Sequence, residues 1–111
     1  MKYDRRIHKY FRLGDVVINE TIWGVKPFII HGFGGNRYCP ELYVHNKGDA
    51  VKGSCIWDVR LTKLVDSNRR PFKNLKKDEL SKLFKNSKES VKKEIEREII
   101  IRINKRIYGL I

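Results

Sequence analysis

A change of residue pattern after position 65 most constrains how this chain of 111 residues can fold. From Gly14 to Val65, short β-branched and aromatic runs alternate with glycine, proline and asparagine. This pattern is typical of a small antiparallel barrel or sandwich, with strand-like runs at 16–18, 28–31, 42–45, 55–57 and 61–65. After a polar segment that ends at Pro71, the apolar residues recur at helical spacing. The chain is therefore predicted to be mainly β, with appended helices.

Two helices are predicted after Pro71, a short one around 76–85 and a longer one from about residue 87 onward. Asn86 is a candidate N-cap of the longer helix, because Glu89 follows it at capping-box spacing. In this helix an apolar residue recurs at every fourth position, which predicts a stripe that requires a partner surface. The stripe consists of Val91, Ile95, Ile99, Ile103 and Ile107. The charged residues between them predict a solvated face with salt bridges.

The charge of the chain points to a polyanionic partner. It has 25 Lys and Arg residues against 13 Asp and Glu, a formal net charge of +12, which favours nucleic acid first and an anionic membrane surface second. The longest apolar runs have three residues, far too few to span a bilayer, and no secretory signal follows the N-terminus. We therefore expect a cytoplasmic protein with no membrane partner, in which Cys39 and Cys55 are free thiols.

The stretch 24–40 combines glycines, a histidine and a cysteine, so it could form a phosphate loop, a metal site or a hairpin. It lacks both G-x-G-x-x-G and GK[ST], and strands rather than helices flank its G-x-x-G at residues 32–35. Two histidines and two cysteines offer zinc-type donors, but seven, five and nine residues separate them in order, without a C-x-x-C knuckle. We expect no metal and no cofactor, and interpret the stretch as a hairpin.

Three pieces of the N-terminal half, in order and at similar spacing, resemble one protein family. They are Gly14-Asp15-Val16-Val17, Gly24-Val25-Lys26-Pro27-Phe28-Ile29-Ile30 and Gly35-Asn36-Arg37-Tyr38-Cys39-Pro40. They resemble the MazF/PemK toxins, sequence-selective endoribonucleases of toxin–antitoxin systems, and residues 57–64 and 75–83 are similar to later family segments. The resemblance covers about residues 10–84.

This resemblance implies a small SH3-like antiparallel barrel over about residues 10–66, followed by a short helix. Residues 1–85 would form the barrel domain. Residues 86–111 lie beyond the usual family length, and we expect them to form a helical extension that packs on the barrel or on a second copy. The implied partners are single-stranded RNA, an acidic antitoxin and a second copy in a homodimer.

The family cleaves RNA by attack of a ribose 2′-hydroxyl on the adjacent phosphate. Lys26 stands where the family has an arginine, and no hydroxyl residue stands at the position of the family threonine. A lysine keeps the charge but lacks the bidentate fork that matches a phosphate. Two functions stay open: an endoribonuclease, or a catalytically silent module on the same barrel that binds nucleic acid or protein.

The candidate catalytic residues are Lys26, His31 and His45. Lys26 stands at the position of the family arginine, and an imidazole can give or take a proton near neutral pH. If 41–46 is a strand, His45 lies on the face opposite Leu42 and Val44. Bases stack on aromatic rings while cations follow phosphates, so aromatic and basic residues of this half are candidate RNA contacts. These candidates are Trp23, Arg37, Tyr38, Tyr43 and Lys47. Core packing is the other interpretation for each aromatic residue, and we favour it for Trp57.

Overall fold

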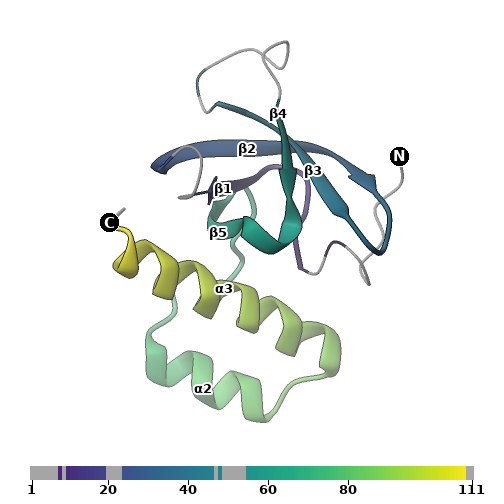
Figure 1. Ribbon diagram of the computed structural model, residues 1–111. Helices are drawn as coiled ribbons and strands as arrows, with labels where there is room; N and C mark the ends of the chain where they lie inside the picture. The colour runs from purple at the N-terminus through teal and green to yellow at the C-terminus, as the bar shows by residue number, and fades with distance from the viewer. Residues whose placement is uncertain (1–7, 9, 20–23, 47, 49–54, 110–111) are drawn as a thin grey trace.

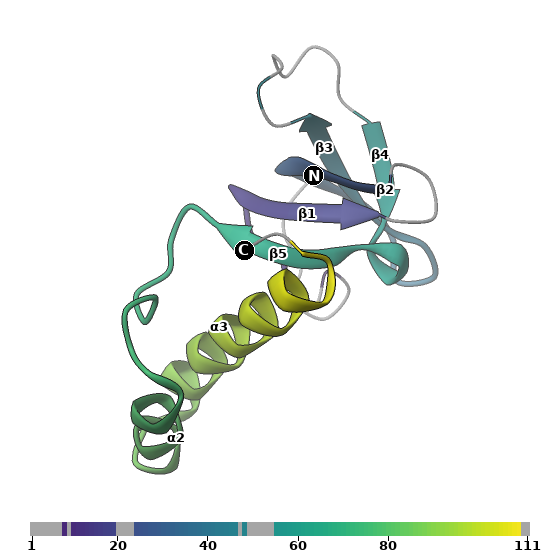
Figure 2. The same ribbon diagram turned by 90° about the vertical axis from the view of Figure 1, so that its left-hand side faces the viewer.

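The computed structural model of the protein describes residues 8, 10–19, 24–46, 48 and 55–109. They form an antiparallel β-sheet and two α-helices (Figure 1). The strands are β1 (Asp15–Asn19), β2 (Gly24–Gly35), β3 (Pro40–Asn46), β4 (Cys55–Asp58) and β5 (Lys63–Ser67), with a 3-10 helix η2 (Val59–Leu61) between the last two. The helices are α2 (Lys77–Lys85) and α3 (Glu89–Ile107). Figures 1 and 2 show α3 between β5 and α2.

The five strands lie in the order β4-β3-β2-β1-β5, and every neighbouring pair is antiparallel. The first four strands follow one another, and β5 returns to pair with β1. In the described residues the sheet is open, with β4 and β5 at its edges. The predicted class, mainly β with appended helices, is confirmed, while closure into an SH3-like barrel stays a prediction.

The stretch 24–40 is a hairpin, as predicted. Its turn is closed by the Asn36 side chain, whose Oδ1 accepts hydrogen bonds from the backbone N–H groups of Tyr38 at 2.9 Å and Cys39 at 3.0 Å. Gly35 precedes the turn with a φ of 76°, and a Cβ there would lie 2.1 Å from the Cys39 carbonyl oxygen. The turn geometry therefore requires glycine at position 35.

The core lies between the sheet, the segment before β1 and one position of α3. Trp57 is 1 % exposed and its ring centroid lies 4.6 Å from that of Phe28, which confirms its predicted place in the core. The cluster of buried side chains consists of Phe11, Val17, Phe28, Ile30, Phe33, Leu42, Val44, Trp57, Val59, Leu64 and Ile101. Cys39 is exposed and Cys55 is half-buried, and the two described cysteines do not form a disulfide.

The predicted boundary between the two helices is wrong at Asn86. This residue ends α2, where its N–H donates to the Leu83 carbonyl at 3.2 Å, and the N-cap of α3 is Lys88. The short helix was predicted well, because Glu79 accepts a hydrogen bond from the Lys76 N–H at 2.9 Å and fixes its start. Among the described residues, neither helix is long and apolar enough to cross a membrane.

The predicted faces of α3 are wrong at several positions. Ile95 is buried, but Ile99, Ile103 and Ile107 are exposed. In their place α3 buries Arg97 and Glu98, which the sequence pattern assigned to a solvated face. The physical reason is that ion pairs with the sheet and the linker fix the rotation of the helix.

Four polar contacts hold α3 in this rotation. Arg97 pairs with Asp15 of β1 at 2.8 Å, and Glu98 pairs with Arg70 at 2.7 Å. Lys105 pairs with Asp66 of β5 at 3.0 Å, and the Asn104 side chain donates to the Leu64 carbonyl at 2.7 Å. The helix is therefore docked largely by charge and hydrogen bonds, with Ile101 as its contribution to the apolar core.

Candidate nucleic-acid interface on the β2–β3 hairpin

The structure brings two of the predicted catalytic residues together. The ring centroids of His31 on β2 and His45 on β3 lie 5.5 Å apart, with the ring planes inclined at 44°. In β3 the side chains of Leu42 and Val44 are buried while Tyr43 and His45 are half-buried, so the strand alternates as predicted. The histidine pair thus lies on the face of the hairpin opposite the core side of β3.

Strand alternation gives His31 the face of Ile29, which pairs with His45, and the strand pairing becomes irregular at His31 itself. Ile30 pairs with Val44, but the next pair is Gly32 with Tyr43, so His31 is an additional residue in β2. Beyond this β-bulge the alternation is shifted by one residue, so Phe33 is buried although regular alternation would place it on the face of His31. Bulges are over-represented beside active sites, and this one lies at the histidine pair.

Hydrogen bonding distinguishes the two imidazoles. The Nδ1 atom of His45 lies 3.1 Å from the Asn46 carbonyl oxygen, which can only accept, so Nδ1 carries the proton and Nε2 keeps a free lone pair. The Nε2 atom of His31 is buried and has no hydrogen-bond partner among the described residues. A buried polar atom without a partner is rare and calls for an explanation.

Tyr43 lies across two glycines of β2. A Cβ at Gly32 would lie 3.0 Å from its Cδ2 atom, and a Cβ at Gly34 would lie 2.2 Å from its hydroxyl oxygen. The His8 ring fixes β2 at this point, since its Nε2 lies 2.9 Å from the Gly34 carbonyl oxygen. The glycines therefore make room for an aromatic ring that lies flat against the strand.

Two further predicted RNA contacts lie at the tip of the hairpin. Arg37 and Tyr38 are exposed in the turn, and the Arg37 guanidinium lies 5.4 Å from the centre of the Tyr38 ring. Tyr38 is 77 % exposed, so its ring is free to receive a base. Aromatic and basic groups thus follow one hairpin from His45 to its tip.

Lys26 is not brought to the histidines. It is exposed near the start of β2, and strand alternation gives it the face of Phe28 and Ile30, which are buried. His45 pairs with Ile29, whose side chain points to the other face. Trp23 and Lys47 lie outside the described residues.

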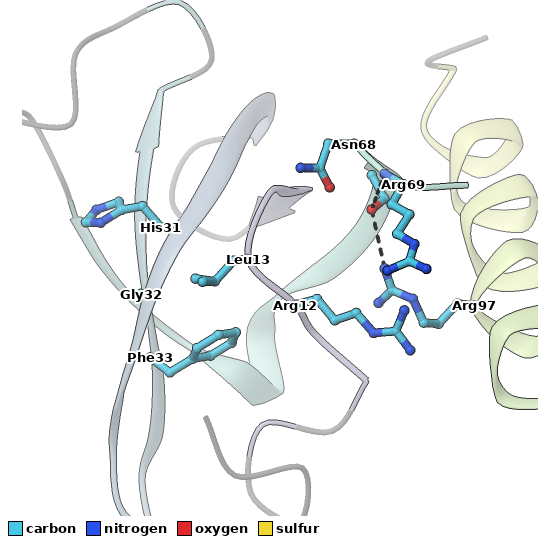
Figure 3. A pocket seen from close by; sticks show the side chains of 9 residues that line it. Arg12, Leu13, His31, Gly32, Phe33, Asn68, Arg69 and Arg97 are labelled. Carbon is cyan, nitrogen blue, oxygen red and sulfur yellow. Dashed lines mark hydrogen bonds between the residues drawn. The ribbon is translucent and has the colours of Figure 1, made fainter. Parts of the chain in front are cut away.

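A pocket of 580 Å³ is lined in part by His31, whose ring points away from the arginine side (Figure 3). His31, Gly32 and Phe33 of β2 form one wall, and Asn68, Arg69 and Arg97 form the opposite wall. Leu13 lies between the two walls, and Arg12 lines the arginine side. His31 is therefore common to the histidine pair and to the pocket.

The three arginines of the pocket differ in how far their charge is balanced. Arg97 pairs with Asp15, and Arg12 pairs with Glu94, whose pKa is lowered below its usual value by the Arg12 hydrogen bond. Arg69 is exposed and makes no ion pair within the described part of the chain. Arg69 is thus the cation of this pocket most available to an anionic ligand.

Sequence reasoning missed this pocket. Its arginines come from the segment before β1, the linker after β5 and α3, which are far apart in the sequence. Arg69 and Arg70 lie in the polar segment that ends at Pro71, where two adjacent arginines were a usable signal of an anion-binding surface. The buried role of Arg97 had no sequence signal, because Arg97 lies among other charged residues of a helix.

Among the described residues, no group of three or more His, Cys, Asp or Glu side chains is placed to hold a metal ion. Comparisons with protein-family models, with curated proteins and with solved structures found no match. Function is therefore inferred from the geometry of the hairpin and the pocket.

Proposed function

We propose that this chain is an RNA-binding protein of the MazF/PemK type that cleaves single-stranded RNA on the outer face of the β2–β3 hairpin. The observation that carries the proposal is the contact between the rings of His31 and His45, 5.5 Å apart at their centroids. Cleavage through a 2′-hydroxyl needs one group that takes a proton and one that gives a proton. Two adjacent imidazoles can supply both, because each can hold or release a proton near neutral pH.

The proposed step assigns a role to each imidazole. His45 Nε2 takes the proton of the ribose 2′-hydroxyl, and the resulting oxygen attacks phosphorus. A bond forms from O2′ to phosphorus, the bond from phosphorus to O5′ breaks, and protonated His31 gives its proton to O5′. The products are a 2′,3′-cyclic phosphate and a 5′-hydroxyl. The hydrogen bond from His45 Nδ1 to the Asn46 carbonyl supports this assignment, because it leaves Nε2 as the base.

The surroundings of the pair support RNA as the substrate. The rings of Tyr43 and Tyr38 can stack with bases, and Arg37 and Arg69 can follow phosphates. In this proposal Lys26 contacts the RNA backbone at the start of β2 and does not act at the reacting phosphate, because it is on the other face of the strand. Trp23 and Lys47 stay predicted contacts.

Two further observations agree with this type of protein. The return of β5 to β1 is compatible with closure into a small SH3-like barrel. The net charge of +12 suits both RNA and an acidic antitoxin. We place the protein in the cytoplasm, where such a substrate and such a partner occur.

The position of Lys26 on the strand face opposite the histidine pair favours the second candidate function, a catalytically silent module that only binds RNA. One experiment separates the two: the protein is incubated with a long single-stranded RNA, and the new ends are mapped. Cleavage should give 5′-hydroxyl ends, and it should stop when the ribose at the cut site carries a 2′-O-methyl group. Intact RNA with salt-dependent binding would support the silent module in place of the enzyme.

A further inference from the structure

The side of α3 away from the sheet carries exposed isoleucines. Ile99 is 39 %, Ile103 46 % and Ile107 65 % exposed, while Ile101 is 1 % exposed on the side that packs against the core. At a spacing of four residues they form one continuous apolar stripe along the helix. A helix that buries charged residues and exposes isoleucines has an apolar face without a partner in the described chain. Contiguous apolar patches of this kind mark interaction surfaces.

Two charged residues lie at the ends of this stripe. Glu96 precedes Ile99 by three positions, and Arg106 follows Ile103 by three positions. Both side chains are exposed, and neither forms an ion pair within the described residues. We call Glu96, Ile99, Ile103, Arg106 and Ile107 the α3 stripe.

The spacing within the α3 stripe is that of a helix pair. Glu96 and Ile103 are seven positions apart, and Ile99 and Arg106 are also seven positions apart. Positions seven apart line one seam of two packed helices. The α3 stripe therefore has two such seams, Glu96 with Ile103 and Ile99 with Arg106. The negative charge of Glu96 lies toward the N-terminal end of the stripe, and the positive charge of Arg106 lies toward its C-terminal end.

We propose that the α3 stripe binds the same surface of a second copy of this chain, with the two helices antiparallel. A two-fold axis between Ile99 and Ile103 places Ile99 of each copy opposite Ile103 of the other. The same axis places Glu96 of each copy opposite Arg106 of the other, so the dimer contains two Glu96–Arg106 ion pairs. A contact of this kind is isologous and closed.

Charge complementarity favours a second, antiparallel copy of the chain as the partner of the α3 stripe. A parallel pair of helices would set Glu96 against Glu96 and Arg106 against Arg106, which is unfavourable. An acidic protein partner would have no counterpart for Glu96. Figures 1 and 2 place α3 below the sheet, beside β5 and α2, and away from the β2–β3 hairpin. Pairing through α3 therefore leaves the hairpin open, and the inference does not depend on the proposed function.

The first test is the mass of the full chain in solution by sedimentation velocity. The protein should sediment at twice the chain mass of 13.2 kDa at micromolar concentration. Ile103→Glu should give a monomer with an unchanged circular dichroism spectrum, because Ile103 is exposed in the free chain. Leu61→Glu is the matched control, since Leu61 is also 46 % exposed but lies on η2, and it should stay dimeric. A wild-type monomer, or a dimeric Ile103→Glu protein, would overturn the proposal.

The second test is a charge exchange. Glu96→Arg and Arg106→Glu should each raise the dimer dissociation constant about tenfold or more, because like charges then face each other. The double variant should recover the affinity of the wild type, since both pairs are restored with reversed sign. Lys82→Glu, an exposed position of α2, should change nothing. Dimerisation that the single reversals leave unchanged, or that the double variant fails to recover, would exclude this pairing.

Discussion

Arg97 in the middle of α3 and Asp15 at the start of β1 form a buried bidentate ion pair. Arg97 Nη2 lies 2.8 Å from Asp15 Oδ1, and Nη1 lies 3.1 Å from Oδ2, with side chains 5 % and 0 % exposed. The same carboxylate accepts the Ser67 hydroxyl at 2.9 Å and the Arg12 N–H at 2.8 Å. The two carboxylate oxygens of Asp15 thus accept four hydrogen bonds. One residue ties the start of the sheet, its last strand and the C-terminal helix together.

Asp15→Asn should therefore destabilise the protein by about 3 kcal/mol, because it leaves the buried guanidinium of Arg97 without its counter-charge. Urea denaturation followed by circular dichroism measures this change in the free energy of unfolding. Asp78→Asn, an exposed position in the first turn of α2, is the control and should change stability by less than about 0.5 kcal/mol. Equal effects for the two variants would contradict the role of the pair.

The docking of α3 should fail in acid. Arg12 lowers the pKa of Glu94 by its hydrogen bond. Burial alone would raise the pKa of Glu98 and Asp66, but Arg70 and Arg102 around Glu98, and the Ser67 N–H and Lys105 around Asp66, outweigh it and lower both. The unfolded chain then binds protons first, at the ordinary values of 4.5 for Glu and 3.8 for Asp.

The contribution of these carboxylates is therefore complete above about pH 5 and is lost as the pH falls through their lower folded pKa values. Urea denaturation at pH 7, 5, 4 and 3 should show a nearly constant free energy of unfolding down to pH 5 and a fall below it. Glu98→Gln should be less stable at pH 7 and should show a weaker pH dependence. Stability that stays constant to pH 3 would contradict the electrostatic docking of α3.

The sheet was predictable from the sequence because its signals are local. Strand alternation in β3, the glycine turn after β2 and the proline stop before the helices are each fixed by a few adjacent residues. The faces of α3 were not predictable, because the helix pattern offers an isoleucine stripe as the obvious buried side. Partners far away in the sequence decided against it, above all Asp15 for Arg97 and Arg70 for Glu98.

Some features of the candidate site were likewise predictable from local sequence patterns, and others depend on tertiary packing. The faces of His45 and His31 follow from strand alternation, but their contact depends on the register of β2 against β3, which no local pattern gives. The pocket beside His31 required three segments that only tertiary packing brings together. The sequence thus contained the chemistry of the site, and the strand pairing and the docking of α3 supply its geometry.

Tyr43 is expected to stack with a base, so Tyr43→Leu should weaken RNA binding by about 1–3 kcal/mol. Gly34→Ala should weaken it as well, since the added Cβ would lie 2.2 Å from the Tyr43 hydroxyl oxygen and displace the ring. Fluorescence anisotropy with a short single-stranded RNA measures both. Tyr108→Leu, at the end of α3, should bind like the wild type. Full affinity for Tyr43→Leu would remove Tyr43 from the interface.

Arg69 is expected to contact a phosphate, so Arg69→Ala should make RNA binding less dependent on salt. The slope of the logarithm of the binding constant against the logarithm of salt concentration should become shallower by about 0.7 for one phosphate contact. Lys82→Ala, on α2, is the control and should keep the slope of the wild type. A slope that Arg69→Ala leaves unchanged would place the RNA away from the pocket.

The rate at which new 5′-hydroxyl ends form on a single-stranded RNA tests the central claim most directly. The wild type should cleave, while His45→Ala and His31→Ala should each cut at least about 100-fold more slowly, in line with the loss of a general base or acid. Both variants should bind the RNA within about threefold of the wild type, because Tyr43, Arg37 and Arg69 are unchanged. Equal cleavage by the wild type and both variants, or no cleavage by any of them, would contradict catalysis by the histidine pair.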